Sequence, residues 1–417
     1  MKRVDGEYDV IVIGGGPAGM MAAGTAGKEG KKVLLLEKNK DLGEKLKITG
    51  GGRCNITNYE LDNRKLLKHY GDAEPYLYSP FSQFSVKDTF TFFERRKLPL
   101  VVQARGRVFP KTERAYDVYL VLKKYLKDNN VTTLLNHPVI KLIKNEKGNI
   151  SLIETKNGKR FKTKNVILAT GGTSHPETGS TGDGFRWLEK LGHTVVRPSP
   201  DIVPLKSPEP WLKDVSGISL SFMRIHFYLN GEHQFSRLGK ILFTHFGISS
   251  PLILNSAREV SKLLKQGVVE AKIDMFPDTD HQKLDKRLVK LIEQNKNKYI
   301  KNVLPELTPK KLAEVILAIT KVDGNTKVHS LSSDARKQIV NTMKSLPLHI
   351  EGLMGMERAV IADGGIPLDE VDTRTMRSKK IENLFLTGDI LHITRPSGGY
   401  SLQLCWTTGF VAGKHTK

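Results

Sequence analysis

Residues 8–19 read Y-D-V-I-V-I-G-G-G-P-A-G, and this stretch decides the fold. Residues 8–13 are mostly apolar and β-branched, which predicts a buried strand. Residues 17–29 are rich in Ala, Gly and Met and open on a proline, which predicts a helix that ends before Gly30. Three glycines therefore fall on a turn from strand to helix: Gly14, Gly16 and Gly19.

Glycines at these positions are typical of a turn that binds a dinucleotide. Gly14 permits the tight turn, Gly16 lets the backbone approach a pyrophosphate, and Gly19 lets the helix pack closely on the strand. A second predicted strand, residues 32–36, ends on Glu37, where a Rossmann unit places the acid that accepts from a ribose hydroxyl. A glycine-rich turn without a ligand is the alternative, and the sequence of strand, turn, helix, strand and acid argues against it.

A second pair of segments near the C-terminus suits the other half of a flavin dinucleotide. Residues 383–389 read N-L-F-L-T-G-D, a strand ending on Asp389, whose carboxylate could accept from the ribityl hydroxyls of FAD. Residues 397–399 form a glycine-rich turn before a helix at 400–413, and the start of such a helix stabilises negative charge on a reduced flavin ring. An ordinary strand, turn and helix is the alternative.

The composition is that of a globular protein with a strongly basic balance. A length of 417 residues predicts two or three domains. No segment approaches the roughly 18 apolar residues of a membrane span, so we expect a cytoplasmic protein that does not contact a membrane. Two cysteines, Cys54 and Cys405, exclude a disulfide framework and a Cys-rich metal site, and we expect no metal.

The formal net charge of +22 arises from 66 Lys and Arg against 44 Asp and Glu. Residues 94–114 and residues 281–304 each carry seven basic side chains against two acidic ones. This balance favours a polyanion partner, most simply nucleic acid, and a solvated basic surface is the alternative.

Local patterns divide the chain into an α/β fold with an insert. Asn157-Gly158 and Asn230-Gly231 predict hairpin turns, and the prolines of residues 70–84 predict a broken segment. Prolines accumulate from residue 197, where the pattern becomes β-rich, and polar-faced helices follow at 281–297, 309–320 and 334–344. We expect an FAD-binding Rossmann-like domain at 1–196 and 355–417, a β-rich insert at 197–275 and a helical insert at 276–354.

Five segments carry a family resemblance: G-E-K-L-K-I-T-G-G-G-R-C-N-I-T-N (43–58), G-R-V-F-P (106–110), A-T-G-G (169–172), L-F-T-H-F-G-I-S-S-P (242–251) and T-M-R-S-K (375–379). With the turn and the strand end above, they resemble the BaiN/RdsA family of NAD(P)/FAD-dependent oxidoreductases over nearly the whole chain. The sequence departs from the family at Asp389, where Glu is common, and at Ser401, where Asn is common. Asp389 keeps the acceptor, and Ser401 puts the contact of the Asn in doubt.

The resemblance implies FAD contacts at Gly14, Gly16, Pro17, Ala18, Gly19, Glu37, Lys38, Lys45, Thr49, Gly51, Gly52, Arg53, Cys54, Asn55, Val139, Ala169, Thr170, Gly171, Gly388, Asp389, Gly398, Gly399, Tyr400 and Ser401. NAD(P)H is then a transient reductant, because no second G-x-G-x-x-G occurs.

The candidate proton donors are Cys54, which the resemblance places against the flavin, and His245, on the turn T-H-F-G. A packing role for Cys54 and a structural role for His245 are the alternatives. The candidates for holding an anionic substrate are Arg53, Arg105 and Arg107.

The resemblance also implies two substrate classes. One is a uridine of 23S ribosomal RNA, reduced to dihydrouridine by hydride from flavin N5, and the other is a small steroid-like enone or an aminoketone. The net charge favours ribosomal RNA, because a small substrate needs no basic surface. An RNA-binding assembly factor that retains FAD without catalysis is a further alternative.

Overall fold

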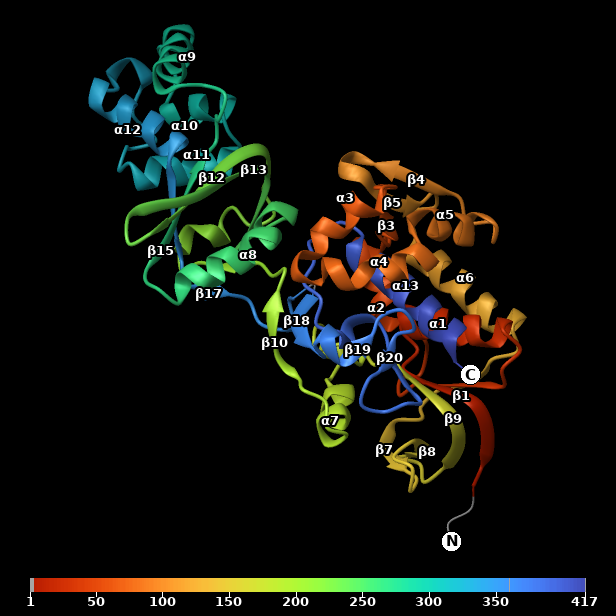
Figure 1. Cartoon of the computed structure of the whole chain (residues 1–417). Coiled ribbons are helices and arrows are strands. Elements are labelled where there is room, and N and C mark those ends of the chain that lie inside the picture. Colours follow the sequence, from red (N-terminus) through yellow and green to blue (C-terminus); the bar gives the residue numbers. More distant parts are fainter. Residues whose placement is uncertain (1–3, 360, 417) are drawn as a thin grey trace. The chain divides into compact units, whose positions relative to one another are not determined.

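The computed structural model describes residues 4–359 and 361–416. Within this part of the chain, contacts define two compact units, unit 1 (Met1–Pro200 and Ala359–Lys417) and unit 2 (Asp201–Arg358), shown in Figure 1. We propose that unit 1 is the Rossmann-like domain and that unit 2 is the insert, with its β-rich and helical parts divided near residue 275.

The sheet of unit 1 contains β1 (Gly6–Ile13), β2 (Val33–Leu36), β6 (Thr132–Leu134), β7 (Val139–Lys144), β8 (Ile150–Thr155), β9 (Arg160–Leu168), β19 (Val371–Asp372), β20 (Arg377–Ser378) and β21 (Leu384–Leu386). The strands run in the order β19-β20-β21-β9-β1-β2-β6. The strands from β21 to β6 run parallel to one another. The β7–β8 hairpin extends the sheet through β8, which pairs antiparallel with the first residues of β9. Both faces of a parallel sheet are covered, so every residue of β2 is buried.

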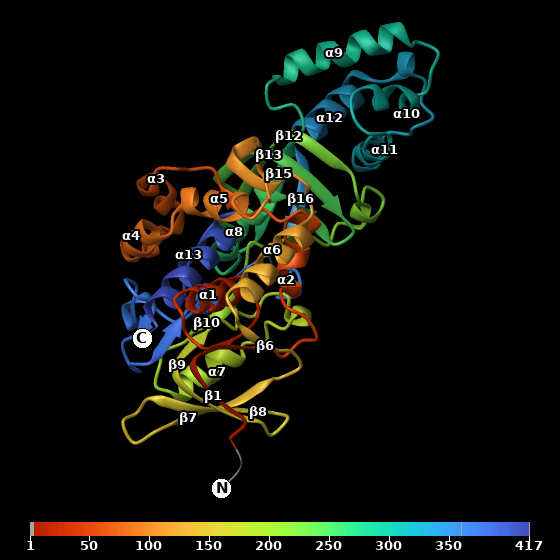
Figure 2. The same cartoon turned by 90° about the vertical axis from the view of Figure 1, so that its right-hand side faces the viewer.

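The helices of unit 1 are α1 (Pro17–Lys28), α2 (Glu44–Ile48), α3 (Asn63–Leu67), α4 (Glu74–Gln83), α5 (Val86–Glu94), α6 (Ala115–Asp128), α7 (Asp183–Lys190) and α13 (Tyr400–His415). Helix α1 packs against the sheet and against α13, which lies beside it in Figure 2. Small residues permit this approach, since a Cβ at Gly409 would lie 2.5 Å from the Ala18 carbonyl oxygen. A smaller antiparallel sheet has the order β3-β5-β4, with β3 at Thr57–Asn58, β5 at Arg107–Pro110 and β4 at Leu100–Gln103. Strand β10 (Val196–Asp201) pairs with β18 (Ile361–Gly365).

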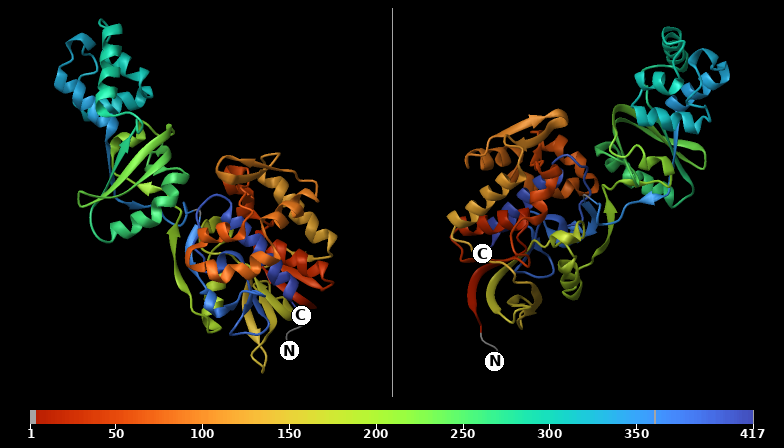
Figure 3. Two further views of the ribbon diagram at one scale, coloured as in Figure 1. Left: turned by 45° about the horizontal axis from the view of Figure 1, so that its top comes forward. Right: turned by 180° about the vertical axis from the view of Figure 1, so that it is seen from behind.

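Unit 2 combines an antiparallel sheet with a group of helices. Its strands are β11 (Leu205–Lys206), β12 (Ser219–Leu229), β13 (Glu232–Thr244), β14 (Gly247–Ser249), β15 (Val269–Asp274), β16 (Leu346–Ile350) and β17 (Gly352–Leu353), in the order β16-β15-β12-β13-β14-β11-β17. Its helices are α8 (Pro251–Leu264), α9 (His281–Gln294), α10 (Ile300–Val303), α11 (Lys310–Ile319) and α12 (Ser333–Lys344), and α9–α12 gather at one end of the sheet in Figure 3.

Both predicted hairpin turns are confirmed. Asn230 and Gly231 connect β12 to β13 with φ of 49° and 87°, as a two-residue turn requires. Asn157-Gly158 lies between β8 and β9, which pair antiparallel. The prediction that prolines break residues 70–84 was wrong for the second half, because α4 runs through Pro80. Pro75 stands at the start of that helix, where its missing N–H costs no hydrogen bond.

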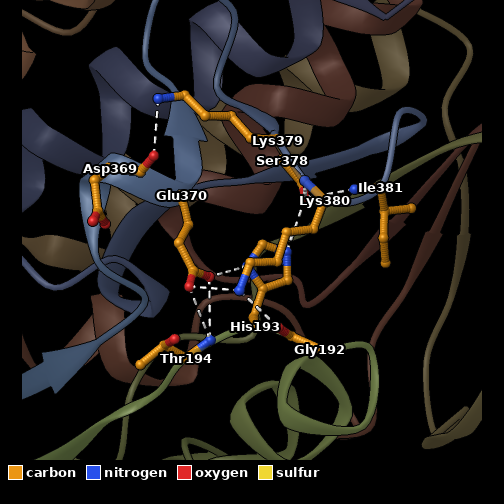
Figure 4. A network of polar contacts seen from close by, with 9 residues as sticks. All are labelled: Gly192, His193, Thr194, Asp369, Glu370, Ser378, Lys379, Lys380 and Ile381. Carbon is orange, nitrogen blue, oxygen red and sulfur yellow. Dashed lines mark hydrogen bonds and ion pairs between the residues drawn. The ribbon is translucent and has the colours of Figure 1, made fainter.

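A partly buried network fixes the loop after α7 to the β19–β20 hairpin (Figure 4). The Glu370 carboxylate pairs with Lys380 at 2.6 Å and accepts from the Thr194 backbone N–H at 3.1 Å. Since a carboxylate accepts, His193 Nδ1–H donates to Glu370 at 2.7 Å, and His193 Nε2 then accepts from the Ser378 hydroxyl at 2.8 Å. Ser378 Oγ in turn accepts from the two backbone N–H groups at positions 380 and 381. The serine of the T-M-R-S-K segment therefore has a structural role.

We expect Glu370→Gln to lower the free energy of unfolding at pH 7 by about 1–3 kcal/mol, the range for losing charge-assisted hydrogen bonds. Burial alone raises the pKa of Glu370, but the hydrogen bonds from Lys380, Thr194 and His193 outweigh burial and lower the pKa to about 2. The stabilisation is therefore complete above the ordinary pKa of 4.5 and is lost as the pH falls towards 2.

Thermal melts of both proteins between pH 7 and pH 3 measure this. The difference in Tm should be widest at pH 7 and narrow on acidification, whereas Glu189→Gln, at an exposed position of α7, should change Tm little at any pH. A difference that stays constant with pH would contradict the assignment.

Candidate functional site

The turn after β1 has the geometry that its glycines predict. Gly14 has φ of 105°, and a Cβ there would lie 2.5 Å from the Ala169 carbonyl oxygen at the end of β9. A Cβ at Gly19 would overlap the Gly14 carbonyl oxygen. At Gly16, the residue that caps α1, a Cβ would meet nothing within 4 Å. Gly14 and Gly19 thus serve packing, while Gly16 faces an open cavity.

This cavity lies where the parallel strands β1, β9 and β21 end, the edge at which open α/β sheets bind ligands. The predicted FAD contacts that line it are Gly14, Gly16, Pro17, Ala18, Glu37, Lys38, Lys45, Thr49, Val139, Ala169, Thr170, Gly171, Gly388, Asp389 and Ser401. Segments far apart in the sequence thus meet around one cavity that belongs entirely to unit 1.

Glu37 is held firmly at the cavity wall. One carboxylate oxygen accepts from the Gly15 backbone N–H at 2.7 Å, and the other accepts from the Asn39 backbone N–H at 2.8 Å. Glu37 is buried and makes no ion pair with any residue that the structure describes. The carboxylate therefore has a fixed direction and retains lone pairs for a hydroxyl group of a ligand.

Two buried polar atoms of the cavity wall, Thr170 Oγ1 and His137 Nε2, have no hydrogen-bond partner among the residues that the structure describes. His137 Nδ1 lies 2.6 Å from the Leu135 carbonyl oxygen, which can only accept, so Nδ1 carries the proton and Nε2 presents a lone pair in the neutral ring. Unpartnered buried polar atoms are costly, and a polar ligand in the cavity would satisfy both. Sequence analysis missed His137, although it stands two residues before Val139, a predicted contact.

Lys45 contributes a cation to the same wall. Its ammonium donates to the Ser174 hydroxyl at 3.0 Å and forms no ion pair within the described part of the chain. Burial lowers the pKa of Lys45, and the charge of Asp389 opposes this effect. An anionic group in the cavity would compensate the buried ammonium.

Asp389 makes a contact that the sequence did not predict. Its carboxylate is paired with Arg395, a buried residue that also donates from Nε to the Ser401 hydroxyl at 3.0 Å. Ser401, at the position where Asn is common in the family, therefore accepts a hydrogen bond within the protein at the cavity wall. Asp389 retains lone pairs for a ligand hydroxyl.

The remaining predicted FAD contacts do not line the cavity: Gly19, Gly51, Gly52, Arg53, Cys54, Asn55, Gly398, Gly399 and Tyr400. Cys54 is fully buried with φ of 61°, and burial raises its pKa to about 12, so the thiol stays protonated at neutral pH. Asn55 Oδ1 accepts from the Val108 backbone N–H at 3.2 Å. Tyr400 is buried, with its ring 4.8 Å from that of His69.

The three predicted substrate arginines lie around the strand that contains Phe109. The Arg53 guanidinium stands 4.3 Å from the centre of the Phe109 ring and pairs with Glu113 at 3.1 Å. Arg107 stands 5.9 Å from the same ring. Arg105 is exposed with φ of 63°.

His245 belongs to unit 2, on the turn between β13 and β14. It is exposed, and its ring lies 5.0 Å from that of Phe246.

Several cavity residues were not predicted from the sequence, namely Asn39, His137, Thr178, Gly179, Ser180, Asp183, Trp187, Thr387, Leu402 and Cys405. Gly15 and Gly43 belong to predicted segments but were not singled out. Within the described residues, no cluster of His, Cys, Asp and Glu could hold a metal ion, and no helix is long and apolar enough to cross a bilayer.

Known proteins resemble the chain over its whole length. Residues 8–415 match the family described as "HI0933-like protein Rossmann domain". A 3-dehydro-bile acid delta(4,6)-reductase of Clostridium scindens is 27% identical over 97% of each chain. The ribosomal RNA dihydrouridine synthase of Escherichia coli is 26% identical over 98% of this chain and 97% of its own.

Among solved structures, the 3-ketosteroid-delta4-(5alpha)-dehydrogenase of Rhodococcus jostii shares the fold. It superposes with a TM-score of 0.59 at 14% identity, covering 100% of this chain and 98% of the dehydrogenase. Together with the signature segments, the family match shows that the chain belongs to the HI0933-like Rossmann family, a family of FAD-dependent oxidoreductases.

Proposed function

We propose that this protein binds FAD in the cavity of unit 1 and, with NAD(P)H as reductant, reduces a uridine of 23S ribosomal RNA to dihydrouridine. Bound FAD supplies hydride transfer to a carbon–carbon double bond conjugated to a carbonyl group. The protein positions the flavin and the substrate and supplies a proton. A ribosomal RNA substrate also implies that the protein acts in the cytoplasm.

The cavity suits FAD through groups of matching character. Open space at Gly16, beside the start of α1, fits a pyrophosphate, and the buried ammonium of Lys45 supplies positive charge near an anionic group. Glu37 and Asp389 offer acceptors for the ribose and ribityl hydroxyls. The unpartnered Nε2 of His137 would accept from an amino or hydroxyl group.

Basic side chains on one face of α9 are the observation that supports RNA as the substrate. Leu284 and Leu288 are buried, so Arg287 and Lys290 lie on the exposed side, and neither forms an ion pair with a described residue. Lys283 pairs only with Asp280, which caps the same helix, at 3.5 Å. Uncompensated cations on one face of a helix fit the phosphates of RNA, whereas a steroid-like enone would gain nothing from them.

Two other functions remain as alternatives. A small enone or aminoketone is the first, because the Clostridium scindens reductase is as similar to this chain as the Escherichia coli synthase. An RNA-binding assembly factor that keeps FAD without catalysis is the second, and it would use the same cavity and the same basic face, so only a measurement of product separates it from the proposed function.

The proposed proton donors are Cys54 and His245. The Cys54 thiol holds its proton at neutral pH and is fully buried, so it must become accessible before it can donate to a substrate. His245 is exposed on the turn between β13 and β14 of unit 2.

We expect the purified protein to be yellow and to release FAD on heating, as chromatography of the nucleotide will show. Gly16→Val should lower FAD occupancy at least about tenfold, because the new side chain enters the open space of the cavity without a clash within the protein. Gly352→Val is the matched control, since a Cβ at Gly352 also meets nothing within 4 Å and lies outside the cavity. Equal FAD content in both variants, or release of NAD, would contradict the proposal.

Mapping dihydrouridine in ribosomal RNA from cells with and without the gene tests the substrate. One uridine should be unmodified in cells without the gene, and the normal gene should restore its modification. The variant Lys283→Glu/Arg287→Glu/Lys290→Glu should restore the modification poorly. Its RNA binding should depend less steeply on salt, with the slope of log K against log[salt] reduced by about 0.7–0.9 for each lost phosphate contact.

A control reversal on the same unit, Lys240→Glu/Lys262→Glu/Lys265→Glu, should restore modification, and both proteins should keep FAD and NAD(P)H oxidation. An unchanged dihydrouridine map without the gene would favour the small-molecule alternative.

Comparison of Cys54→Ala with His245→Ala identifies the proton donor. Loss of the donor should slow product formation by about 10²-fold or more while FAD content and flavin reduction by NAD(P)H stay normal. Stopped-flow absorbance at the flavin band measures reduction, and quantification of dihydrouridine measures product. Normal product formation by Cys54→Ala would assign Cys54 to packing.

A further inference from the structure

A second cleft of unit 1 carries a dense group of basic side chains. It is bordered by the turn between β7 and β8, by the segment from β19 to the residues just before β21, and by Tyr76 of α4. None of its residues lines the FAD cavity. The residues Arg377 and Lys379 of the T-M-R-S-K segment face this cleft, so the cleft uses the part of that segment that the Ser378 network leaves unexplained.

The cleft is basic on balance, since six Lys and Arg side chains line it against the two carboxylates of Asp372 and Glu382. Arg374 pairs with Asp372 at 3.0 Å, and Lys380 pairs with Glu370 at 2.6 Å. The remaining ammonium and guanidinium groups are those of Lys144, Lys147, Arg377 and Lys379, none of which pairs with a carboxylate in the part of the chain that the structure describes. Lys379 donates only to the Asp369 carbonyl oxygen, at 2.8 Å, as Figure 4 shows. Several unpaired cations in one concave site fit a ligand with several phosphate groups.

The cleft lies at the opposite edge of the sheet from the FAD cavity. Residues 381 and 382, which border the cleft, precede β21, and Gly388, which lines the cavity, follows it. The chain turns at residues 381–384 and is then extended from Leu384 to Gly388, which spans about 13 Å at the rise of a strand. A hydride donor must touch the flavin ring, so the cleft is not placed for the nicotinamide. A polymer fits both sites if its reacting base lies in the FAD cavity and its backbone continues to the cleft.

Tyr76 adds a feature that a free phosphate would not use. Tyr76 is 38% exposed and lines the cleft. Cations beside an exposed aromatic ring are the combination with which proteins bind single-stranded nucleic acid, because phosphates contact the cations and a base stacks on the ring.

We propose that this cleft binds the phosphates of a single-stranded segment of the RNA substrate, with one base stacked on Tyr76. The proposal rests on RNA as the substrate of the proposed function. It adds to unit 1 an RNA contact that is separate from α9 of unit 2.

Fluorescence anisotropy of the FAD-loaded protein with a labelled 20-nucleotide oligouridylate, at several salt concentrations, tests this site. Lys144→Glu/Lys147→Glu/Arg377→Glu should weaken binding more than about tenfold and reduce the slope of log K against log[salt] by about 2, as expected for three lost contacts to a single strand. Tyr76→Ala should weaken binding about tenfold with the slope unchanged. FAD content and NAD(P)H oxidation should be normal in both variants.

The charge-matched control is Lys28→Glu/Lys87→Glu/Lys127→Glu, three exposed lysines of unit 1 outside both cavities. The proposal would be overturned if the two reversed proteins lost RNA binding equally, or if the slope were unchanged in the cleft variant. It would also be overturned if the cleft variant showed a raised KM for NAD(P)H in place of weaker RNA binding. The dihydrouridine map separates this outcome from failure of the proposed function. If the map is unchanged in cells without the gene, the proposed function is wrong. If the modification is lost in those cells but the cleft variant binds RNA normally, only the proposal for the cleft is wrong.

Discussion

Unit 1 depends on the close packing of helix α1 against backbone atoms on two of its sides. On one side the helix meets the turn after β1, where only a hydrogen atom fits at Gly19, and on the other it meets α13 at Gly409. Residues 18–26 are buried as a result. The ends of β1, β9 and β21 therefore come together around the start of α1, and the cavity is the space that remains between them. The binding site is a product of backbone packing before any side chain contributes to it.

Substrate choice in this family has a different physical basis from cofactor binding. Relatives named for a bile-acid reduction and for a ribosomal RNA modification are equally similar to the chain, and both descriptions fit reduction of a conjugated double bond. A shared cofactor site cannot separate such substrates, so discrimination must come from surfaces outside the cavity. Two basic surfaces of this protein lie outside the cavity, on α9 of unit 2 and beside β20 in unit 1, and these are the surfaces that we propose bind the substrate. Each is a local excess of charge that the total of +22 does not locate.

The sequence predicted what depends on short-range pattern. The strand, turn and helix at residues 8–29 and the acid at Glu37 follow from local periodicity and from glycine, and the structure places them as expected. His137 and Trp187 line the cavity because a loop and helix α7 converge at the edge of the sheet. The predicted contact at Val139 was a local signal for His137, whereas no motif marked Trp187. Cys54 was expected beside the ligand; it is fully buried, has a φ of 61° and does not line the cavity. The partner of Asp389, Arg395, lies six residues away, beyond the reach of a motif.

The return of the chain into unit 1 determines the order in which the protein can be made. Unit 2 is continuous in sequence, so all of its strands and helices have been synthesised before β21 and α13 exist. Unit 1 lacks the strand beside β9 and the helix beside α1 until the last 60 or so residues emerge, which takes several seconds at roughly 5–20 residues per second. During that interval the apolar surface of β9 and α1 is uncovered. A nascent chain of this protein therefore exposes apolar surface of β9 and α1 for some seconds after all the strands and helices of unit 2 have been synthesised.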